Sequence, residues 1–474
     1  MPSLAESMLA LRTIAASAPV ATLAQAFADR GHEFALVGGP VRDALLGRSV
    51  TDLDFTTSAH PDETRAILDT LTQNVWDVGR DFGTIAARLH GETVEITTYR
   101  AETYRDDSRK PEVSFGDTIE GDLVRRDFTI NALALMLPEM RLVDVSDGIE
   151  DLLAGRIRTP GSPEASFTDD PLRMLRAARF ASQLGFEVVP ETQASMWELA
   201  ERLDIISAER VRDEFVKLLS TPDPVPGIRL LVETGLVDRF LPELTALTST
   251  QDDHGRHKDV YEHSLTVLRQ AIELEEERGH EPSPDVVLRI AALLHDIGKP
   301  ATRRFEHGGV TFHHHDVVGA KLVKKRLREL RFDNDTIKRT ARLVELHLRF
   351  FGYSDQQWTD SAVRRYVRDA GDELDRLHIL TRADVTTRNR RKAERLAHAY
   401  DDIERRIGEL AEAEELAAVR PELDGERIMA LLEIPPGPLV GRAYKYLLEV
   451  RLDEGPIGEA AAEERLRAWY AQQN

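Results

Sequence analysis

The 474-residue sequence contains no cysteine. This absence excludes disulfide bonds, thiol catalysis and cysteine-ligated zinc, so any metal must be held by histidines and carboxylates. Long apolar runs are also missing, both at the N-terminus, where a secretory signal would stand, and at the length of a membrane span. We therefore expect a cytoplasmic protein with no membrane partner.

Basic residues are scarce beside acidic ones: 62 lysines and arginines against 83 aspartates and glutamates give a net charge of -21. This balance disfavours extensive contact with nucleic acid, because phosphates are bound by lysine and arginine. It leaves room for a local basic groove on an acidic body. Two stretches, 321–342 and 382–395, are locally basic, and RNA contact explains each about as well as a solvated helix face.

The residue pattern divides the chain into two parts. Its length and 42% hydrophobic content fit two to four globular domains. Up to about residue 144, β-branched runs alternate with glycine-rich turns, and beyond residue 157 the pattern is amphipathic helix. This predicts an α/β head with a small mixed sheet, followed by an all-α body. Strands are predicted at 34–37, 52–55, 84–89, 93–98, 132–137 and 142–144, and helix breaks at 160–163, 190, 221–226 and 281–284.

The first predicted strand runs into Gly38-Gly39-Pro40, and Arg42 follows within one helical turn. Glycines let backbone N–H groups approach a phosphate closely, and a helix that begins near Pro40 adds partial positive charge. Gly38, Gly39 and Arg42 are therefore candidate phosphate ligands. Taken alone, a purely structural Gly-Gly turn explains the pattern equally well.

Asp52 and Asp54 stand two residues apart on the next predicted strand. Strand alternation puts both carboxylates on one face, with Leu53 on the other. Like charges so close are costly without a cation between them, and magnesium that bridges a nucleoside triphosphate meets that need. Glu95, on a later strand, is a third candidate ligand. The pattern predicts a two-metal site that activates a 3′-hydroxyl and holds the leaving pyrophosphate.

These motifs resemble a known family. Gly38-Gly39-Pro40-Val41-Arg42-Asp43 with Asp52-Leu53-Asp54 is similar to the nucleotidyltransferase head of the class II CCA-adding enzyme and bacterial poly(A) polymerase family, within the polymerase-beta-like superfamily. The stretch 125–132 resembles the motif that contacts sugar and triphosphate, which implies that role for Arg126, Asp127 and Asn131.

The resemblance continues in order through the next eighty residues. The stretch 147–151 resembles the hinge between head and neck, and 169–173 with Arg176 and Arg179 resembles the nucleotide-selecting helix. The stretch 207–210 resembles a motif that braces this helix. The chain departs from the family pattern by one conservative change, Asp169 in place of glutamate. A nucleotide-binding role is thereby implied for Asp170, Arg173, Arg176 and Arg179.

Base selection can be argued from Asp170 and Arg173, which are three residues apart and would share one face of a helix. Aspartate only accepts hydrogen bonds, and arginine only donates them. Cytosine and adenine both present an amino donor beside a ring-nitrogen acceptor, so one such pair recognises both. Uracil and guanine present the reverse, and each failed hydrogen bond costs about 1–3 kcal/mol. The pair predicts CTP and ATP as substrates, although a lone surface ion pair has the same spacing.

The resemblance implies addition of C, C and A to the 3′ end of tRNA, and poly(A) polymerase on the same scaffold is the nearest alternative. The stretch 79–85 resembles the CCA-adding version, and the C-terminus lacks a long basic tail. Candidate hinges for the change from C to A are Gly148 and the loop 106–114. Neither shows the motion itself.

Histidines gather in the second half of the chain. His263, the pair His295-Asp296 and Asp384 resemble an HD-type metal-dependent phosphohydrolase, in which ligands from separate helices converge on a divalent ion such as Mg, Mn, Ni or Co. Some members with this fused domain hydrolyse 2′-phosphates or 2′,3′-cyclic phosphates at RNA ends. Further candidates are His315 and His347, for a second metal or a phosphate, and more weakly His257, His313 and His314.

The expected order is a nucleotidyltransferase head (1–158), a helical neck (159–245), an HD-type domain (246–400) and a helical C-terminal tail (401–474), the last a candidate for the tRNA elbow on position alone. Two other hypotheses remain: the HD site is the working enzyme and the head only grips RNA, or the protein binds RNA without catalysis. The aspartate pair of the head disfavours the first, and the net charge disfavours the second. The oligomeric state stays open.

Overall fold

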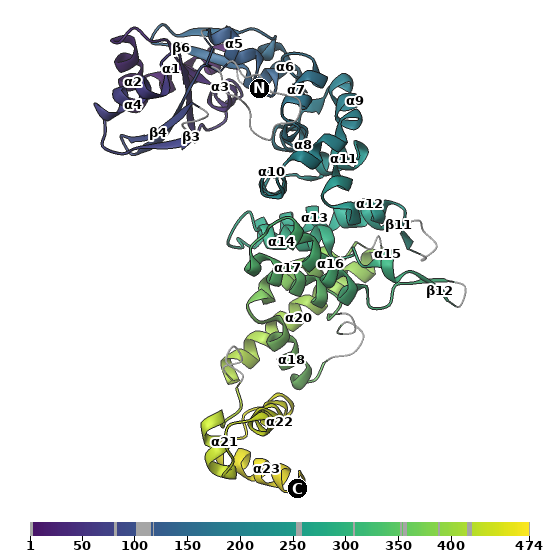
Figure 1. Cartoon of the computed structure of the whole chain (residues 1–474). Coiled ribbons are helices and arrows are strands. Elements are labelled where there is room, and N and C mark those ends of the chain that lie inside the picture. Colours follow the sequence, from purple (N-terminus) through teal and green to yellow (C-terminus); the bar gives the residue numbers. More distant parts are fainter. Residues whose placement is uncertain are drawn as a thin grey trace. The chain divides into compact units, whose positions relative to one another are not determined.

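A computed structural model describes residues 3–79, 83–100, 115–116, 118–252, 258–306, 309–350, 353, 358–386, 389–414 and 420–473. The chain divides into two compact units, Met1–Pro242 and Glu243–Asn474 (Figure 1). The predicted head lies in the first unit, and so does the predicted neck except for residues 243–245. Three features of the sequence lie outside the described residues: the loop 106–114, residues 80–82 of the stretch that resembles the CCA-adding version, and His257.

The head is built on a mixed sheet in the strand order β3-β4-β5-β2-β1-β6-β7. Neighbouring strands are antiparallel, except that β2 and β5 run parallel. The mixed sheet expected from the sequence is thus confirmed. The strands are β1 (Phe34–Val37), β2 (Leu53–Thr57), β3 (Val75–Gly79), β4 (Thr84–Leu89), β5 (Glu92–Thr98), β6 (Leu133–Leu137) and β7 (Arg141–Asp144).

Strand β3 is the one member of this sheet that the sequence pattern did not predict. It lies at the edge of the sheet, and its apolar side chains Trp76 and Val78 are 42% and 50% exposed. Alternation of apolar and polar residues identifies a strand only where the apolar positions face a core. At this edge they face solvent, so the pattern carried no signal.

One face of the sheet is covered by α1 (Leu4–Ala15), α2 (Ala18–Ala28) and α4 (Pro61–Asp69), which share a core with it. Phe34 stands in the middle of this core, with its ring stacked on Phe27 at 4.5 Å and on Phe55 at 4.7 Å. On the opposite face α5 (Ile119–Val124) packs against β1 and β6. The side chains of β2 and β5 that alternate with core positions point to this second face.

No single helix among the described residues is long and apolar enough to cross a membrane. The segments Ala5–Ala15 and Ala18–Ala28 meet that criterion only when joined, and the chain bends by 72° between them.

The neck completes the first unit with helices that begin where the sequence predicts breaks. α7 and α9 start at Pro163 and Pro190, because proline fits the first turn of a helix, where no N–H partner is needed. Ser182 of α8 accepts a hydrogen bond from the backbone N–H of Gly227 in α11 at 2.8 Å. The helices are α6 (Gly148–Ala154), α7 (Pro163–Asp169), α8 (Leu172–Leu184), α9 (Pro190–Glu198), α10 (Ala208–Leu219) and α11 (Val225–Glu233).

The second unit is helical, as predicted, and its described residues also form two short antiparallel strand pairs, β10 (Gln251–Asp252) with β11 (Lys258–Asp259), and β12 with β13. Its centre contains buried ion pairs between helices, Glu275 with Arg289 at 3.0 Å and Asp285 with Arg376. The elements are α12 (Pro242–Thr248), α13 (Val260–Glu277), α14 (Val286–Leu294), α15 (Lys299–Thr302), β12 (Arg304–Glu306), β13 (Gly309–Thr311), α16 (His315–Glu329), α17 (Asn334–Leu346), α18 (Asp360–Ala370), α19 (Leu374–Ala383) and α20 (Arg390–Glu414).

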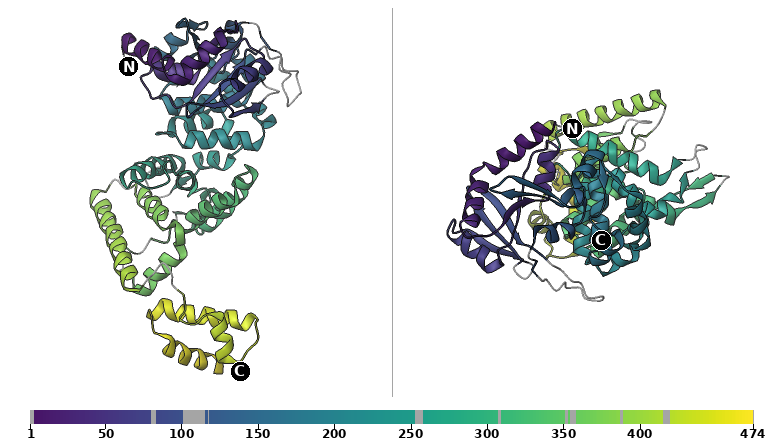
Figure 2. Two further views of the ribbon diagram at one scale, coloured as in Figure 1. Left: turned by 90° about the vertical axis from the view of Figure 1, so that its left-hand side faces the viewer. Right: turned by 90° about the horizontal axis from the view of Figure 1, so that it is seen from above.

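The last three helices share a core of their own, seen as the yellow group in Figure 2. They are α21 (Gly425–Leu432), α22 (Pro438–Glu454) and α23 (Glu459–Ala471). The predicted start of a C-terminal tail at residue 401 falls inside α20, whose amphipathic pattern runs without a break to Glu414. A boundary drawn from composition alone therefore cuts a continuous helix.

Gly148, a candidate hinge, is tightly packed at the start of α6. A Cβ atom there would lie 2.2 Å from the carbonyl oxygen of Thr129 and 3.0 Å from a methyl group of Leu133. We expect Gly148→Ala to lower the free energy of unfolding by about 1–3 kcal/mol, the usual cost of overpacking. Urea unfolding followed by circular dichroism measures this. Gly161→Ala is the matched control, because a Cβ there meets no atom within 4 Å; equal midpoints for the two variants would refute the packing argument.

Candidate active sites

The phosphate-binding candidates lie where β1 passes into α3 (Gly39–Leu45). Gly38 adopts φ +76°, a backbone conformation that glycine accepts without steric cost. A Cβ atom on Gly38 would lie 3.3 Å from Nη1 of Arg126, so this guanidinium rests directly against the turn. The Gly38 turn and Arg126 thus offer backbone donors and a positive charge at one place.

The three acidic candidates share the second face of the sheet. Asp52 directly precedes β2, and Asp54 within β2 is the register partner of Glu95 in the parallel strand β5. All three side chains are exposed. Partial loss of water and then the charge of Glu95 raise the pKa of Asp54, while Arg126 opposes the shift. The crowded acids favour a cation, although among the described residues they do not form a close three-ligand group.

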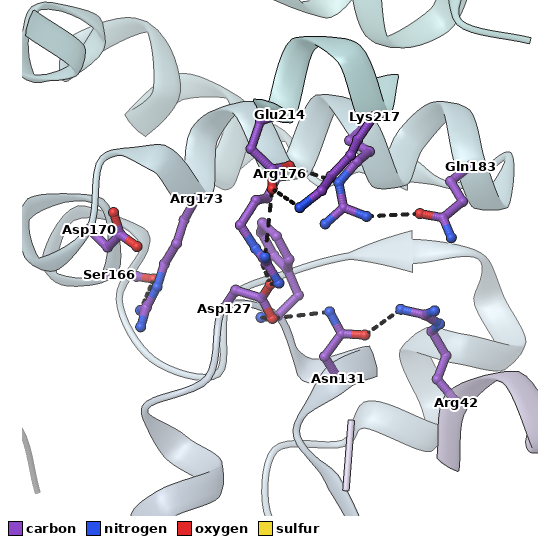
Figure 3. A network of polar contacts seen from close by, with 12 residues as sticks. Arg42, Asp127, Asn131, Ser166, Asp170, Arg173, Arg176, Gln183, Glu214 and Lys217 are labelled. Atoms are coloured by element: carbon purple, nitrogen blue, oxygen red, sulfur yellow. Dashed lines mark hydrogen bonds and ion pairs between the residues drawn. The ribbon is translucent and has the colours of Figure 1, made fainter. Parts of the chain in front are cut away.

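A chain of polar contacts leads from the Gly38 turn to α8 (Figure 3). Arg42 donates to Oδ1 of Asn131 at 2.7 Å, and Asn131 donates to Asp127 at 3.0 Å. Asp127 in turn accepts a 2.7 Å hydrogen bond from Nε of Arg176. Burial alone would raise the pKa of Asp127, but Arg176 and Asn131 hold it far below the ordinary value. Asp127 and Asn131 therefore connect the turn to the helix.

Phe180 lies among three of the candidate arginines, although its place in the motif gave the ring no role. Its centroid is 5.2 Å from the guanidinium of Arg42, 5.6 Å from that of Arg176 and 4.2 Å from that of Arg179. Arg179 also pairs with the buried Glu214 at 2.8 Å. Cation–π contacts and a buried acid thus fix these arginines in position. No spacing in the sequence pointed to Glu214, which lies on α10.

The base-reading candidates sit differently from the expectation that they share a helix. Asp170 is extended, with φ -139° and ψ 97°, and precedes α8. The cause is Pro171, since the residue before a proline is driven out of the helical region. Asp170 accepts from the N–H of Leu172 at 3.2 Å and from Arg210 at 3.3 Å, and Arg210 belongs to the predicted bracing motif.

Arg173 lies in the first turn of α8. Its guanidinium bonds to groups other than Asp170, so the two residues do not form a simple surface ion pair. It donates to Oγ of Ser166 at 2.9 Å and to the carbonyl oxygen of Arg125 at 2.6 Å. Figure 3 shows Asp170 and Arg173 on the same side of the network. The carboxylate and the guanidinium are therefore held independently.

In the second unit the six histidine and aspartate candidates converge from the ends of helices. His295, His347 and Asp384 immediately follow α14, α17 and α19. His263 lies in α13, with its Nε2 atom 2.9 Å from Asp384 and 3.3 Å from Nε2 of His295. The ligand atoms form two compact groups, His263 with His295 and Asp384, and Asp296 with His315 and His347.

Backbone carbonyls orient three of these rings. Nδ1 of His295, His315 and His347 lies 2.9, 2.8 and 2.6 Å from the carbonyl oxygens of Ala292, Phe312 and Val344, each three residues earlier. Because a carbonyl only accepts, Nδ1 carries a proton and Nε2 faces the centre. Nδ1 of His263 contacts Thr386 at 3.1 Å. Such anchoring of the outer nitrogen is typical of histidines that ligate metals.

Asp296 joins the two groups: one of its oxygens lies 3.2 Å from Nε2 of His295, and the other lies 3.3 Å from Nε2 of His315. Burial would lower the pKa of His295, but the charges of Asp296 and Asp384 raise it to about 9. Burial and the charge of His295 lower the pKa of His347 to about 4. Imidazole nitrogens and carboxylate oxygens together are a donor set that fits a divalent transition metal.

One residue near this centre, Lys299, was not among the predicted ligands, and two weaker candidates, His313 and His314, do not belong to the ligand groups. Lys299, three residues after Asp296, places Nζ 2.8 Å from its carboxylate. The i,i+3 spacing within His295-Asp296-Ile-Gly-Lys299 was the available signal for it. His313 and His314 are exposed, and neither belongs to the two compact groups.

Comparison with known proteins gives three family matches in chain order. They are "Poly A polymerase head domain" at 34–158, "Probable RNA and SrmB- binding site of polymerase A" at 185–248, and "HD domain" at 260–389. A solved structure, the Bacillus stearothermophilus CCA-adding enzyme in complex with CTP, shares the fold with a TM-score of 0.68 and 24% identity, over 96% of this chain and 100% of that chain.

Curated relatives match along two different spans. The A-adding tRNA nucleotidyltransferase of Deinococcus radiodurans is 35% identical over 92% of this chain and 94% of its own. The CC-adding tRNA nucleotidyltransferase of Thermus thermophilus is 32% identical over 89% and 90%. The CCA-adding enzyme of Leuconostoc mesenteroides is 46% identical, but over 45% of this chain and 52% of its own. The resemblance read from the motifs is confirmed, and this chain belongs to the tRNA nucleotidyltransferase family.

Proposed function

We propose that this chain adds C, C and A, one nucleotide at a time, to the 3′ end of tRNA from CTP and ATP, without a nucleic-acid template. The observation that carries the proposal is the exposed acidic face of Asp52, Asp54 and Glu95, in the same head as the Gly38 turn and Arg126. Membership of the tRNA nucleotidyltransferase family supports it.

Asp52 and Asp54 would hold magnesium, because carboxylate oxygens are the ligands that this small, hard cation prefers. When bound, the metal neutralises triphosphate charge and lowers the pKa of the attacking 3′-hydroxyl. Backbone N–H groups of the Gly38 turn and the guanidinium of Arg126 bind phosphate oxygens. The 3′-oxygen then forms a bond to the α-phosphorus as the bond to the bridging oxygen breaks, and pyrophosphate leaves.

Asp170 and Arg173 read the base in this proposal. The carboxylate of Asp170 accepts from the amino group of cytosine or adenine, and the guanidinium of Arg173 donates to the adjacent ring nitrogen. Separate anchors, Arg210 on Asp170 and Ser166 on Arg173, keep the two groups from neutralising each other. Arg176 and Arg179 are positioning residues here, since Asp127 and Glu214 hold them beside the ring of Phe180. Arg42, which donates to Asn131 and lies over the same ring, would bind a phosphate oxygen.

A narrower product is the second candidate. Two relatives that align along about nine tenths of both chains are named for adding A and for adding CC. This favours an enzyme that performs part of the addition and leaves the rest to a partner enzyme. Asp170 and Arg173 do not distinguish these products, because the hydrogen-bonding edge that they would read is common to cytosine and adenine.

The product decides between these proposals. Given magnesium, CTP and ATP, we expect the purified protein to extend tRNA that ends at the discriminator base by C, C and A and then halt. Asp52→Ala or Asp54→Ala should lower the rate on the order of a thousandfold, since metal-bound charge supplies several kcal/mol in the transition state. Glu92→Ala, an exposed acid on the same strand as Glu95, is the matched control.

Sequencing gels of the products measure the outcome. Arrest after CC, or a single A added only to tRNA that already ends in CC, would establish the narrower function. A long A tract from ATP alone would identify a poly(A) polymerase. Full activity in the Asp52→Ala and Asp54→Ala variants would overturn the assignment of the acidic face.

Asp170 provides a test of base selection. We expect Asp170→Ala to reduce the preference for CTP over UTP about tenfold, because one discriminating hydrogen bond is lost. Single-nucleotide incorporation, measured as kcat/KM for each triphosphate, gives the ratio. Glu164→Ala removes an exposed carboxylate of α7 outside this motif and should leave the ratio unchanged. An unaltered ratio in Asp170→Ala would exclude this residue from base reading.

A further activity is favoured by the two ligand groups of the second unit. We propose that this HD site binds a divalent metal, Mg, Mn, Ni or Co, through His263, His295, Asp296 and Asp384, and hydrolyses phosphates at RNA ends. The oxygen of a water molecule bonds to the phosphorus of a 2′,3′-cyclic phosphodiester, and one P–O bond to ribose breaks. A proton from that water passes to the departing ribose oxygen. Lys299 holds the carboxylate of Asp296 in place.

Metal content and hydrolysis should fall together in His263→Ala. Metal bound per chain is measured by mass spectrometry after dialysis against each ion, and hydrolysis with 2′,3′-cyclic CMP. We expect metal affinity to drop about 10- to 100-fold or more, and nucleotide addition by the head to stay unchanged. His398→Ala, an exposed histidine on α20, is the control. Full metal content in His263→Ala would contradict the ligand assignment.

A further inference from the structure

A hairpin, β12–β13, interrupts the HD unit between two residues of its candidate metal centre. Asp296 precedes it and His315 follows it. The chain segments on either side touch, since a Cβ on Gly298 would lie 2.1 Å from the carbonyl oxygen of His315 and 2.7 Å from the N–H nitrogen of Gly319. The excursion between them is therefore closed at its base, and that base carries the ligands.

The stem of the excursion is tied to the centre. Lys299, at its first turn, points its ammonium group to the carboxylate of Asp296 at 2.8 Å and stands 5.6 Å from the ring centroid of Phe312 on the returning segment. Figures 1 and 2 show the hairpin extending outward from the helices of its own unit. The stem of the hairpin therefore reaches the candidate metal centre.

The outer part of the hairpin presents an aromatic ring to solvent. Phe305 is 77% exposed, the largest exposed fraction among the exposed large hydrophobic side chains of the described residues. The guanidinium of Arg303 lies over this ring at 5.1 Å, and Arg304 is exposed beside it. Within the described residues neither arginine is paired with a carboxylate. An exposed ring flanked by two such cations is the combination that binds single-stranded nucleic acid, through base stacking and phosphate contacts.

The helix that follows the hairpin continues the positive charge. α16 begins at His315, and its exposed lysine and arginine residues recur every three or four positions, on one helical face. In a chain of net charge -21 this is a local concentration of cations. The exposed basic residues are Lys321, Lys324, Lys325 and Arg328.

We propose that the β12–β13 hairpin is the substrate-binding arm of the HD site and grips a single-stranded RNA end. A base near the 3′ terminus stacks on Phe305, and Arg303 and Arg304 contact the adjoining phosphates. The terminal phosphate then lies toward Lys299 and the metal centre. This inference rests on the proposed phosphohydrolase function, and it names that site's substrate class: a short single-stranded RNA end rather than an isolated nucleotide.

Kinetics on two substrates separates the arm from the metal centre. For an RNA oligonucleotide ending in a 2′,3′-cyclic phosphate, Phe305→Ala should raise KM about tenfold, the loss of one stacked base, with kcat nearly unchanged. Hydrolysis of bis-p-nitrophenyl phosphate, which has no base or chain to grip, should not change. Phe305→Tyr should restore the KM. Arg442→Glu with Lys445→Glu, exposed residues of α22, controls for net charge. Equal KM values in Phe305→Ala and the unaltered protein would overturn the proposal.

A binding test works without hydrolysis. Because the chain has no cysteine, Val310→Cys carries a single thiol, placed opposite Phe305 in the hairpin register. The oligonucleotide should slow alkylation of this thiol, and should leave the thiol of Arg442→Cys unaffected. If hydrolysis of both substrates is absent but protection persists, the phosphohydrolase function fails while the RNA contact stands. If the thiol of Val310→Cys reacts at the same rate with and without RNA, the arm itself is refuted.

Discussion

A carboxylate buried as deeply as Asp127 is stable only where a cation accompanies it, and Arg176 is that cation. The pair joins the loop after α5 to α8, beside the hydrogen bond from Arg173 to the carbonyl oxygen of Arg125. Removing either partner would leave a buried charge unmatched, at a cost of about 3–5 kcal/mol. Asn131 extends the same contact to Arg42 beside the glycine turn. The geometry of the phosphate-binding turn and that of the selecting helix are therefore coupled through this neutralised charge.

The second unit solves the opposite electrostatic problem. Its helices gather four imidazoles and two carboxylates whose ligand atoms face one another. The carbonyls that end α14 and α17 lack helical partners, and the outer nitrogens of His295 and His347 occupy them. This leaves each inner nitrogen pointing inward. The raised pKa of His295 shows a proton held by surrounding carboxylates, the charge that a divalent cation would replace. In the first unit the balancing cation is an arginine of the chain; in the second, Lys299 supplies part of the positive charge, and in our proposal a divalent ion supplies the rest.

Much of the fold and of the two candidate sites could be predicted from the sequence, because the relevant signals are local. Strand alternation placed Asp52 and Asp54 on one face, and proline positions gave the helix starts at Pro163 and Pro190. What the sequence did not reveal depends on packing between distant segments. Glu214 and Arg179 form an ion pair although they are thirty-five residues apart in the sequence. Arg42 joins the other two guanidinium groups beside the ring of Phe180 only when α3 packs near α8. Asp170 left the expected helix because proline geometry overrides spacing, and β3 escaped notice because its apolar side chains face solvent.

The two proposed chemistries are ordered by the requirements of their substrates. The head transfers a nucleotide to a free 3′-hydroxyl, and an RNA end closed as a 2′,3′-cyclic phosphate has none. Hydrolysis of the cyclic ester yields a phosphomonoester, and a second hydrolysis yields the hydroxyl and inorganic phosphate. Each step consumes only water, and a metal ion held at the HD centre would activate that water. The reverse order has no use, because an end already extended to CCA carries no phosphate to remove. A chain that joins these units therefore gains from the second only when its RNA arrives damaged, and this is the condition under which a separate arm for a single-stranded end has a purpose.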